Sequence, residues 1–401
     1  MTLSVSEVEA VPAAERIYEL IRKEIRPRFS EMAACGSTPE LLVHPRYCEL
    51  SDAIQTVLQT PEAGSFAGPV SAPSGPAYRI LAYNLERGIR LDGQIEAFRT
   101  HPYLKTCDVA LLTETDVGMA RSGNRAVAQE LAQKLGMYFV FVPCYLNLAK
   151  GSGVEYDVTG DNDLGLHGNA ILSRYPIRRP RLVHLKNGKD KMKGREKRLG
   201  TQTAVVADIE LPNLAMTVAS VHLDANSTQR HRHDQMRDVL DNLKTDLPVV
   251  LGGDWNTTTY NSSHAFHSIM GFWLRVFMGV DNVINNHYLH PYNRFEKELF
   301  GLLESRGFDY KQCNRLGEYT VSYDVECLKT MKNLNEWVPR WCFPFIRWAL
   351  RNHDGICPIK IDWFATRGLR CENPVIVHDL RQGRAVPLSD HDAIGVDVIA
   401  P

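Results

Sequence analysis

The sequence lacks the features that identify several classes of protein. It has no apolar run of transmembrane length, and its N-terminus has neither the basic segment nor the apolar stretch of a signal peptide. Its nine cysteines are scattered without a Cys-x-x-Cys pair, which is typical of reduced thiols rather than of a disulfide framework. These absences predict a cytoplasmic protein.

The net charge is also close to zero, because 46 Lys and Arg residues are balanced by 47 Asp and Glu residues. This balance argues against a surface that is positive all over for nucleic acid, but it leaves local patches open. With 401 residues and a hydrophobic fraction of 44%, the chain can bury a large core in one big domain or two smaller ones.

The first part of the chain differs from the rest in composition. Apolar spacing predicts an amphipathic helix over residues 12–33 and a second helical stretch over Glu49–Leu58. A segment rich in Pro, Gly, Ser and Ala follows, as is typical of a linker. We expect a helical extension over 1–60, a linker over 61–77 and a main domain over 78–401. The extension either packs on that domain or binds a partner, and packing is favoured.

From Tyr78 onward, short β-prone runs alternate with amphipathic segments, which indicates an α/β domain. The expected strands are Tyr78–Leu85, Val109–Thr113, Met137–Pro143, Asn169–Ser173, Ala204–Ile209, Met216–His222, Val249–Gly252, Ile361–Ala365 and Ala393–Val398. The expected helices are Asn124–Leu135 and Gln229–Leu243. Residues 260–358 contain one clear helix, near Phe295–Arg306, and are interpreted as a long insertion beside a site.

Six short segments follow apolar runs and carry carboxylate, amide or imidazole groups. They are Asn84–Glu86, Thr113–Asp116, Val221–Asp224, Gly252–Asn256, Ile361–Phe364 and Ser389–Asp392. Strand ends that meet at one rim would gather these groups, and so many carboxylates cannot share a site as anions without a cation. Oxygen-rich ligation suits Mg²⁺ or Mn²⁺, and two histidines suit acid–base catalysis. The pattern predicts a metal-assisted hydrolase acting on a phosphoester.

Spacing supports a few of these residues individually. Asp254 and Asn256 stand two apart, so at strand spacing they point the same way. Asp362 could hydrogen-bond His391 and fix its tautomer. Glu114 ends an apolar strand, where a buried charge is costly without a partner or a metal. Each motif alone is equally compatible with an ordinary turn or loop, and the inference depends on their joint presence in this order.

The motifs that occur together are Tyr83–Glu86, Glu114, Gly168–Arg174, His222–Leu223, Gly253–Asn256, Ile361–Asp362 and Ser389–His391. In this order they resemble those of the endonuclease/exonuclease/phosphatase superfamily, which includes deoxyribonucleases, inositol polyphosphate phosphatases, neutral sphingomyelinases and deadenylases. The resemblance covers about Tyr78 to Val398. It implies an α/β fold, a four-layer α/β sandwich of two mixed β-sheets flanked by helices, to which this chain adds its N-terminal helical extension.

The resemblance also implies roles for individual residues in a site that uses Mg²⁺ or Mn²⁺. The metal ligands would be Glu114, Asn84 and Asp390, with Glu86 where some members carry a second acidic group. Asp254 and Asn256 would position the attacking water and the phosphoryl oxygens. Asp362 would orient His391, which serves as general base or phosphate-binding cation, and His222 would be the general acid or phosphoryl stabiliser. Candidates for substrate contact are His167, Asn169, Arg195 and Arg198.

Two segments bear on the substrate. Residues 174–198 hold eleven Lys and Arg against Asp190 and Glu196, which suits a nucleic-acid backbone, an anionic headgroup or a solvated loop. The insertion carries an aromatic group, comprising Trp337, Trp341, Phe343, Phe345 and Trp348, which suits a membrane interface or base stacking. Packing of these rings as the insertion's own core is the favoured expectation.

Three functions remain open from the sequence. The first is a metal-dependent phosphodiesterase of the nuclease type, with nucleic acid as its partner. The second is a lipid or inositol phosphate phosphoesterase, similar to a sphingomyelinase or an inositol phosphatase and acting on a membrane lipid headgroup. The third is an inactive binding module, for which the loss of site residues would be expected. His222–Leu223 argues against the abasic-site endonuclease branch, which the resemblance implies usually lacks this histidine.

Overall fold

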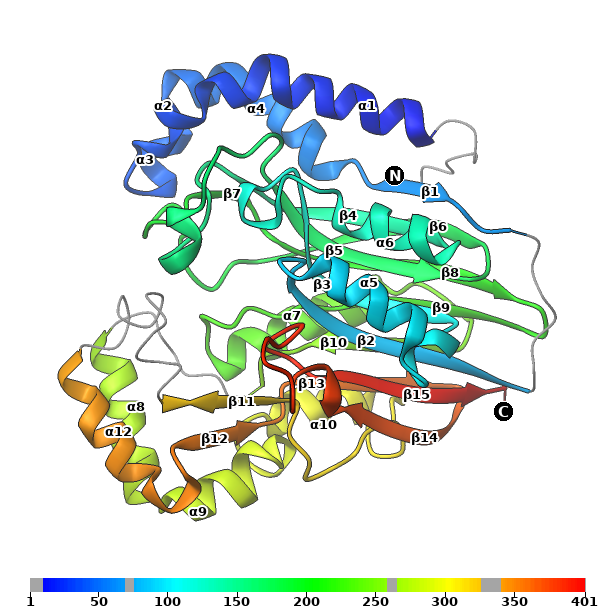
Figure 1. The fold of residues 1–401 in the computed structure, drawn as a ribbon, viewed down its shortest axis with the longest axis vertical. Helices are drawn as coiled ribbons and strands as arrows, with labels where there is room; N and C mark the ends of the chain where they lie inside the picture. The colour runs from blue at the N-terminus through cyan, green and yellow to red at the C-terminus, as the bar shows by residue number, and fades with distance from the viewer. Residues whose placement is uncertain (1–9, 69–75, 258–264, 326–339, 401) are drawn as a thin grey trace.

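The computed structural model describes residues 10–68, 76–257, 265–325 and 340–400. Two mixed β-sheets pack face to face and helices cover their outer surfaces, so the chain forms the four-layer α/β sandwich predicted from the sequence (Figure 1). In the described ranges, no helix is both long enough and apolar enough to cross a bilayer.

The larger sheet has the strand order β1-β4-β5-β3-β2-β15-β14, with β7 pairing onto β4. Strands β2 and β3 are parallel, whereas β15 runs antiparallel to β2. The bounds are β1 Glu62–Ser65, β2 Ala77–Arg87, β3 Val109–Val117, β4 Tyr138–Asn147, β5 Leu166–Ser173, β7 Arg198–Gly200, β14 Arg370–Val377 and β15 Ala393–Ile399.

The smaller sheet has the order β13-β10-β9-β8-β6. Strands β9 and β10 are parallel, and β13 runs antiparallel to β10. The bounds are β6 Ile177–Leu185, β8 Gln202–Leu211, β9 Leu214–Ser220, β10 Val249–Asp254 and β13 Asp362–Arg367. Strands β6 and β14 were not predicted, because Pro180 and Pro374 with their polar neighbours interrupt the apolar pattern.

Alternation along each strand builds the layers, because successive side chains point to opposite faces. In β2, Ile80 and Ala82 enter the core between the sheets, while Leu81 and Tyr83 face the helices outside. The outer helices of the larger sheet are α5 Leu91–Thr100 and α6 Val127–Leu135. Those of the smaller sheet are α7 Gln229–Asn242 and α10 Lys297–Ser305. Gly136 ends α6 in the left-handed conformation (φ 63°) that glycine adopts without steric cost.

The N-terminal segment packs on the larger sheet. Its helices are α1 Ala10–Leu20, α2 Phe29–Ala33, α3 Thr38–Leu42 and α4 Pro45–Gln59, and 3₁₀ geometry around Pro27 interrupts the single helix expected over 12–33. Ile21, Ile25 and Met32 join the same core as Leu146 of β4. Four residues of the expected linker instead form β1, which pairs with β4 through its backbone. Residues 69–75 of that linker lie outside the described ranges.

The insertion contains more structure than its sequence predicted. Besides α10 it holds α8 Ala265–Phe277, α9 Val280–Val283, α12 Phe343–Ala349, and a hairpin of β11 Val321–Asp324 and β12 Ile356–Ile359. A small core joins these elements, and it includes Ile284, Val321, Leu350 and Ile361. None of the described rings of the aromatic group belongs to this core, although Phe343 is buried. The expectation that these rings form the core is wrong for Trp341, Phe345 and Trp348, which are exposed. Trp337 lies outside the described residues.

Candidate functional site

The topology brings the predicted strand ends to one rim. The parallel pairs β2–β3 and β9–β10 end there with Asn84, Glu114 and Asp254, and His222 follows β9 by two residues. The antiparallel strands β13 and β15 begin at the same rim, which places Asp362 and the Asp390–His391 pair there.

Left-handed backbone marks this rim. Glu86, Glu114 and Asn256 have φ values of 46°, 53° and 48°, a region that residues other than glycine seldom adopt. The pairing of β2 with β3 shifts register between Asn84 and Arg87, and that of β3 with β5 shifts between Leu112 and Thr115. Such irregularities re-aim side chains and recur at functional sites.

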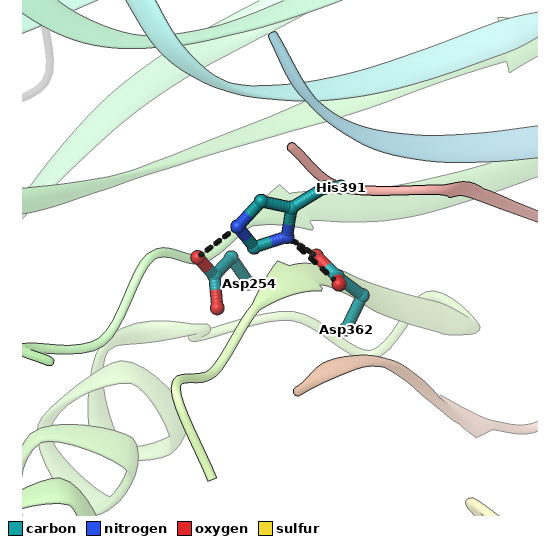
Figure 2. Close-up of side chains that lie close together, drawn as sticks. All are labelled: Asp254, Asp362 and His391. Carbon is teal, nitrogen blue, oxygen red and sulfur yellow. Dashed lines mark hydrogen bonds and ion pairs between the residues drawn. The ribbon is translucent and has the colours of Figure 1, made fainter. Parts of the chain in front are cut away.

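His391 is buried between two carboxylates (Figure 2). Its Nδ1 lies 2.9 Å from Asp362 Oδ2 and its Nε2 lies 3.6 Å from Asp254 Oδ2. Because a carboxylate only accepts, Nδ1 carries the proton in this pair. Burial alone would lower the pKa of His391, but the charges of Asp362 and Asp254 raise it well above its ordinary value. The predicted Asp362–His391 pair is therefore present in the structure.

The carboxylate of Asp254 contacts several polar groups of the rim. Its Oδ2 accepts from Asn84 Nδ2 at 3.1 Å and lies 3.5 Å from His222 Nε2, and its Oδ1 accepts from the backbone N–H of Asn256 at 2.9 Å. Burial raises the pKa of Asp254, His391 opposes this change, and Asp362 adds to it. The Asp254–His391 pair can therefore hold and release a proton within this cluster.

His222 is held neutral. Burial lowers the pKa of His222 to about 4, although the charge of Glu114 acts in the opposite direction. Within the described residues its Nδ1 is buried and has no hydrogen-bond partner. A buried nitrogen of this kind is costly unless a ligand or water completes it.

Two further carboxylates, those of Asp390 and Glu114, lie near Glu86. Burial and the negative charge of Asp390 raise the pKa of Glu86 to about 7; Arg87 opposes the shift and Glu114 adds to it. Burial would also raise the pKa of Glu114, but Arg87 and nearby histidines hold it below its usual range. Asp390 is exposed at the mouth of this group. A hard divalent cation would relieve this repulsion, so the donors fit Mg²⁺ or Mn²⁺.

Another grouping could also hold a metal. One ligand atom from each of Asp254, Asp362 and His391 lies within 4.8 Å of the others. There, however, the imidazole already bonds to Asp362 and lies close to Asp254, so its positive charge compensates the two carboxylates.

The four predicted substrate contacts lie apart from this hydrogen-bonded cluster. His167 is buried with its Nδ1 2.7 Å from Asp116, and Asn169 donates to the backbone oxygen of Thr203 at 2.8 Å. Arg198 pairs with Glu196 and covers the ring of Tyr145, while Arg195 is exposed. Asn256 uses its side-chain Nδ2 to hold the backbone oxygen of Leu223 at 3.0 Å.

The sequence did not predict a buried network of ion pairs around Arg121. Arg121, almost fully enclosed, pairs with Asp116, Glu155 and Glu196, at distances of 2.8, 3.0 and 2.9 Å. Glu155 also pairs with Arg87, which lies 3.7 Å from Glu114. The sequence contains one signal of this network. Asp116 follows Glu114 by two residues, so both side chains lie at the end of the same strand.

The insertion also reaches the site. Val321 forms a β-bridge with His391, and Thr320 Oγ1 accepts the backbone N–H of Asp362 at 3.2 Å. Partial burial and the negative charges of Asp390 and Asp254 raise the pKa of Tyr323. Tyr323 is a further side chain at the rim that the sequence did not single out.

Comparisons with known proteins agree with this geometry. The model of the Endonuclease/Exonuclease/phosphatase family matches residues 81–391. A search of curated proteins finds no match. Similar solved structures include an endonuclease/exonuclease/phosphatase from Beutenbergia cavernae DSM 12333, with 14% identity, a TM-score of 0.46, and coverage of 81% of this chain and 72% of that chain.

Two further structures are similar at the same low level. The human Nocturnin catalytic domain with bound sulfate has 16% identity and a TM-score of 0.43, with coverage of 80% of this chain and 94% of that chain. D. rerio TDP2 complexed with a single-strand DNA product has 14% identity and a TM-score of 0.43, with coverage of 81% and 99%. Because the family model spans well over half of the sequence, this chain belongs to the Endonuclease/Exonuclease/phosphatase family.

Proposed function

We propose that this chain is a metal-dependent hydrolase of phosphodiester bonds, with a nuclease-type substrate as its first candidate. Family membership supports phosphoester hydrolysis, because its members are generally phosphoesterases that depend on divalent metals. The observation that carries the proposal is the buried His391 between Asp362 and Asp254, beside the crowded carboxylates Glu86 and Glu114.

The side chains of the site have different roles in the proposed reaction. Asp362 fixes the tautomer and orientation of His391, which leaves Nε2 to bind a phosphoryl oxygen or to exchange a proton with Asp254. Asn84 holds Asp254 in place through its amide. His222, neutral and with a buried nitrogen to satisfy, is suited to stabilise the phosphoryl group or the leaving oxygen.

Glu114, Glu86, Asp390 and Asn84 would hold Mg²⁺ or Mn²⁺. When bound, such an ion supplies positive charge that stabilises the phosphoryl oxygens. The backbone N–H of Glu86 donates to Asn84 Oδ1 at 2.9 Å, so these two residues are oriented together. The guanidinium of Arg87 lies 3.7 Å from the carboxylate of Glu114 and helps to orient it.

The second candidate is a lipid or inositol phosphate phosphoesterase. The basic segment that suggested a nucleic-acid surface has many of its charges already paired. Arg179 and Arg181 bind Asp208, Lys191 binds Asp224, and Arg198 binds Glu196. Paired cations attract a nucleic-acid backbone or an anionic headgroup less strongly, so this segment favours neither candidate over the other.

A substrate panel with Mg²⁺ and then Mn²⁺ tests the proposal. It contains single-stranded and plasmid DNA, RNA, an inositol polyphosphate, sphingomyelin vesicles and bis-(p-nitrophenyl) phosphate. We expect phosphodiester cleavage that is lost in His391→Ala. Cleavage should be kept in the control His233→Ala, which replaces a half-buried histidine of α7. Release of phosphocholine or of inorganic phosphate would instead select the lipid or inositol phosphate candidate. Turnover of no substrate by the metal-loaded protein would favour the inactive binding module.

A further inference from the structure

Two helices of the insertion form a separate surface. α8 and α12 lie side by side, away from the N-terminal helices (Figure 1). The rings of Trp273 and Phe345 join them, with centroids 5.7 Å apart. The short 3₁₀ helix Arg340–Cys342 precedes α12 and adds Trp341, whose ring centroid lies 6.3 Å from that of Phe345.

Large apolar side chains face outward from both helices. On α8 they recur at intervals of four and three residues, and the same intervals recur across the 3₁₀ turn and α12, so each set lies on one helical face. Exposed fractions run from 43% for Phe345 to 82% for Phe277. The apolar face comprises Met270, Leu274, Phe277, Trp341, Phe345 and Trp348. A contiguous exposed group of this kind marks an interaction site rather than ordinary surface.

Arginines are the charged residues within the two segments that form the apolar face; Arg275 among them is buried, and Asp281 and Asp354 directly follow the segments. Residues 265–280 and 340–353 contain four arginines and no Asp or Glu. Arg347 and Arg351 are exposed, and the guanidinium carbon of Arg351 lies 5.0 Å from the ring centre of Trp348. This local excess stands out because the whole chain is nearly neutral.

We propose that the apolar face of α8 and α12 docks on a bilayer surface that contains anionic phospholipids. Tryptophan rings concentrate at the boundary between headgroups and acyl chains, and bulky side chains such as Phe277 enter the acyl region. Arginines beside them attract anionic headgroups. Helices with one apolar face and cationic flanks lie in the membrane plane and do not cross it.

The docking surface is connected to the catalytic rim. Ile346 of α12 packs on the core of the insertion, which contains Val321 and Ile361. Val321 pairs with His391, and Ile361 precedes Asp362. Docking would therefore hold the catalytic rim near the membrane surface. The proposal does not rest on the proposed hydrolase activity, since binding is measured without turnover.

Vesicle flotation tests the docking surface. The probes are vesicles of phosphatidylcholine alone and of phosphatidylcholine mixed with phosphatidylglycerol, both in EDTA. We expect binding to the anionic vesicles. The double variant Phe277→Ser/Trp348→Ser should weaken it at least about tenfold, which corresponds to ~1.4 kcal/mol. The matched control Leu42→Ser/Val43→Ser changes two exposed apolar residues of the N-terminal segment and should bind as the wild type does.

A second variant keeps the apolar side chains. Arg347→Glu should reduce binding to the anionic vesicles and leave binding to phosphatidylcholine alone unchanged. Quenching of tryptophan fluorescence by brominated lipid should fall in Trp341→Phe/Trp348→Phe, because Trp255 and Trp363 are buried.

Three results would overturn the proposal: no binding of the wild type, equal binding of the double variant, or a dimer that the double variant converts to monomer. The last would assign the face to a second copy of the chain. None of these measurements uses the catalytic reaction, so a failure of the hydrolase proposal would be seen separately, in the substrate panel.

Discussion

At the scale of residues, the site depends on how His391 is held. Asp362→Asn removes the anion that fixes its tautomer and raises its pKa, while the amide preserves the shape of the side chain. We expect the turnover rate to fall by about 10³–10⁴-fold, as in other carboxylate–imidazole pairs whose anion is neutralised. The measurement is kcat on bis-(p-nitrophenyl) phosphate across pH. Asp281→Asn is the control, because Asp281 pairs with His353 in an exposed position. Near-equal loss in both variants would contradict the role of Asp362.

Arg121 is expected to matter for stability. Its replacement by Met leaves Asp116, Glu155 and Glu196 without their shared cation, and an uncompensated buried charge costs about 3–5 kcal/mol. The free energy of unfolding in urea measures this cost. Arg178→Met removes an exposed pair with Glu210 and should cost less than about 1 kcal/mol. Equal losses of unfolding free energy in the two variants would mean that the buried network stabilises the fold no more than an exposed ion pair does.

The same network predicts a pH dependence. Burial raises the pKa of Asp116, but Arg121 and His167 outweigh it and lower the pKa to about 2. The folded-state pKa lies below the unfolded value of about 3.9, so the stabilisation is complete above that value. It is lost as pH falls toward about 2, by roughly 2 kcal/mol. Unfolding measured between these limits should show this loss in the wild type and a shallower one in Arg121→Met.

Residue-level prediction succeeded where spacing along a strand was enough. Asp362 and His391 were paired from sequence, since each lies next to a recognisable strand. His167 and Asn169 stay predictions as substrate contacts, and both hydrogen-bond within the protein. The register shifts beside Glu86 and Glu114 were not predicted, because an added residue exchanges the faces of a strand and apolar alternation does not reveal it.

At the scale of elements, the N-terminal helices hold two loops near the site. Arg22 and Arg26 pair with Asp163, Thr38 binds Asp190, and Lys197 donates to the backbone oxygen of Cys35. Asp163 and Asp190 belong to the segments that carry Glu155 and Glu196. Contacts from the extension therefore reach the Arg121 network indirectly.

Loosening these contacts should increase loop motion more than it lowers stability. Arg22→Ala/Arg26→Ala removes exposed ion pairs worth about 0–1 kcal/mol, so the unfolding midpoint should change little. Amide hydrogen exchange over residues 150–163 should rise. Lys23→Ala is the control, because the ion pair of Lys23 among the described residues is local, with Glu19. Unchanged exchange in the double variant would show that the extension does not restrain this loop.

Most of the elements with clear periodicity were predicted well. The expected strand Val109–Thr113 appears as Val109–Val117, and the expected helix Gln229–Leu243 as Gln229–Asn242. α8 was missed although its apolar residues recur at helical intervals, because it lies in the stretch 260–358 that was interpreted as an irregular insertion. β1 was missed because Glu62–Ser65 has low β-propensity and is a strand only through pairing with β4.

At the scale of the whole molecule, the two sheets and the insertion meet at one rim. The two sheets supply the candidate catalytic side chains, and the insertion contributes the β-bridge of Val321 with His391. The N-terminal helices contact loops farther from the rim, as Thr38 does with Asp190. The sandwich followed from the order of motifs in the sequence. The placement of the insertion did not, because it depends on tertiary contacts such as that of Thr320 with Asp362.

A bound metal should stabilise the whole fold, and this effect can be measured without substrate. Glu86, Glu114 and Asp390 repel one another in the metal-free protein, so a divalent cation that binds only the folded state raises the unfolding temperature. At 100 times the dissociation constant the gain is about 2.7 kcal/mol. We expect Mg²⁺ or Mn²⁺ to raise Tm, EDTA to reverse the rise, and Glu114→Gln to abolish it. Glu318→Gln, an acidic residue that pairs with Arg315, should keep the full shift. An unchanged Tm at saturating Mg²⁺ and Mn²⁺ would exclude these carboxylates as the metal site.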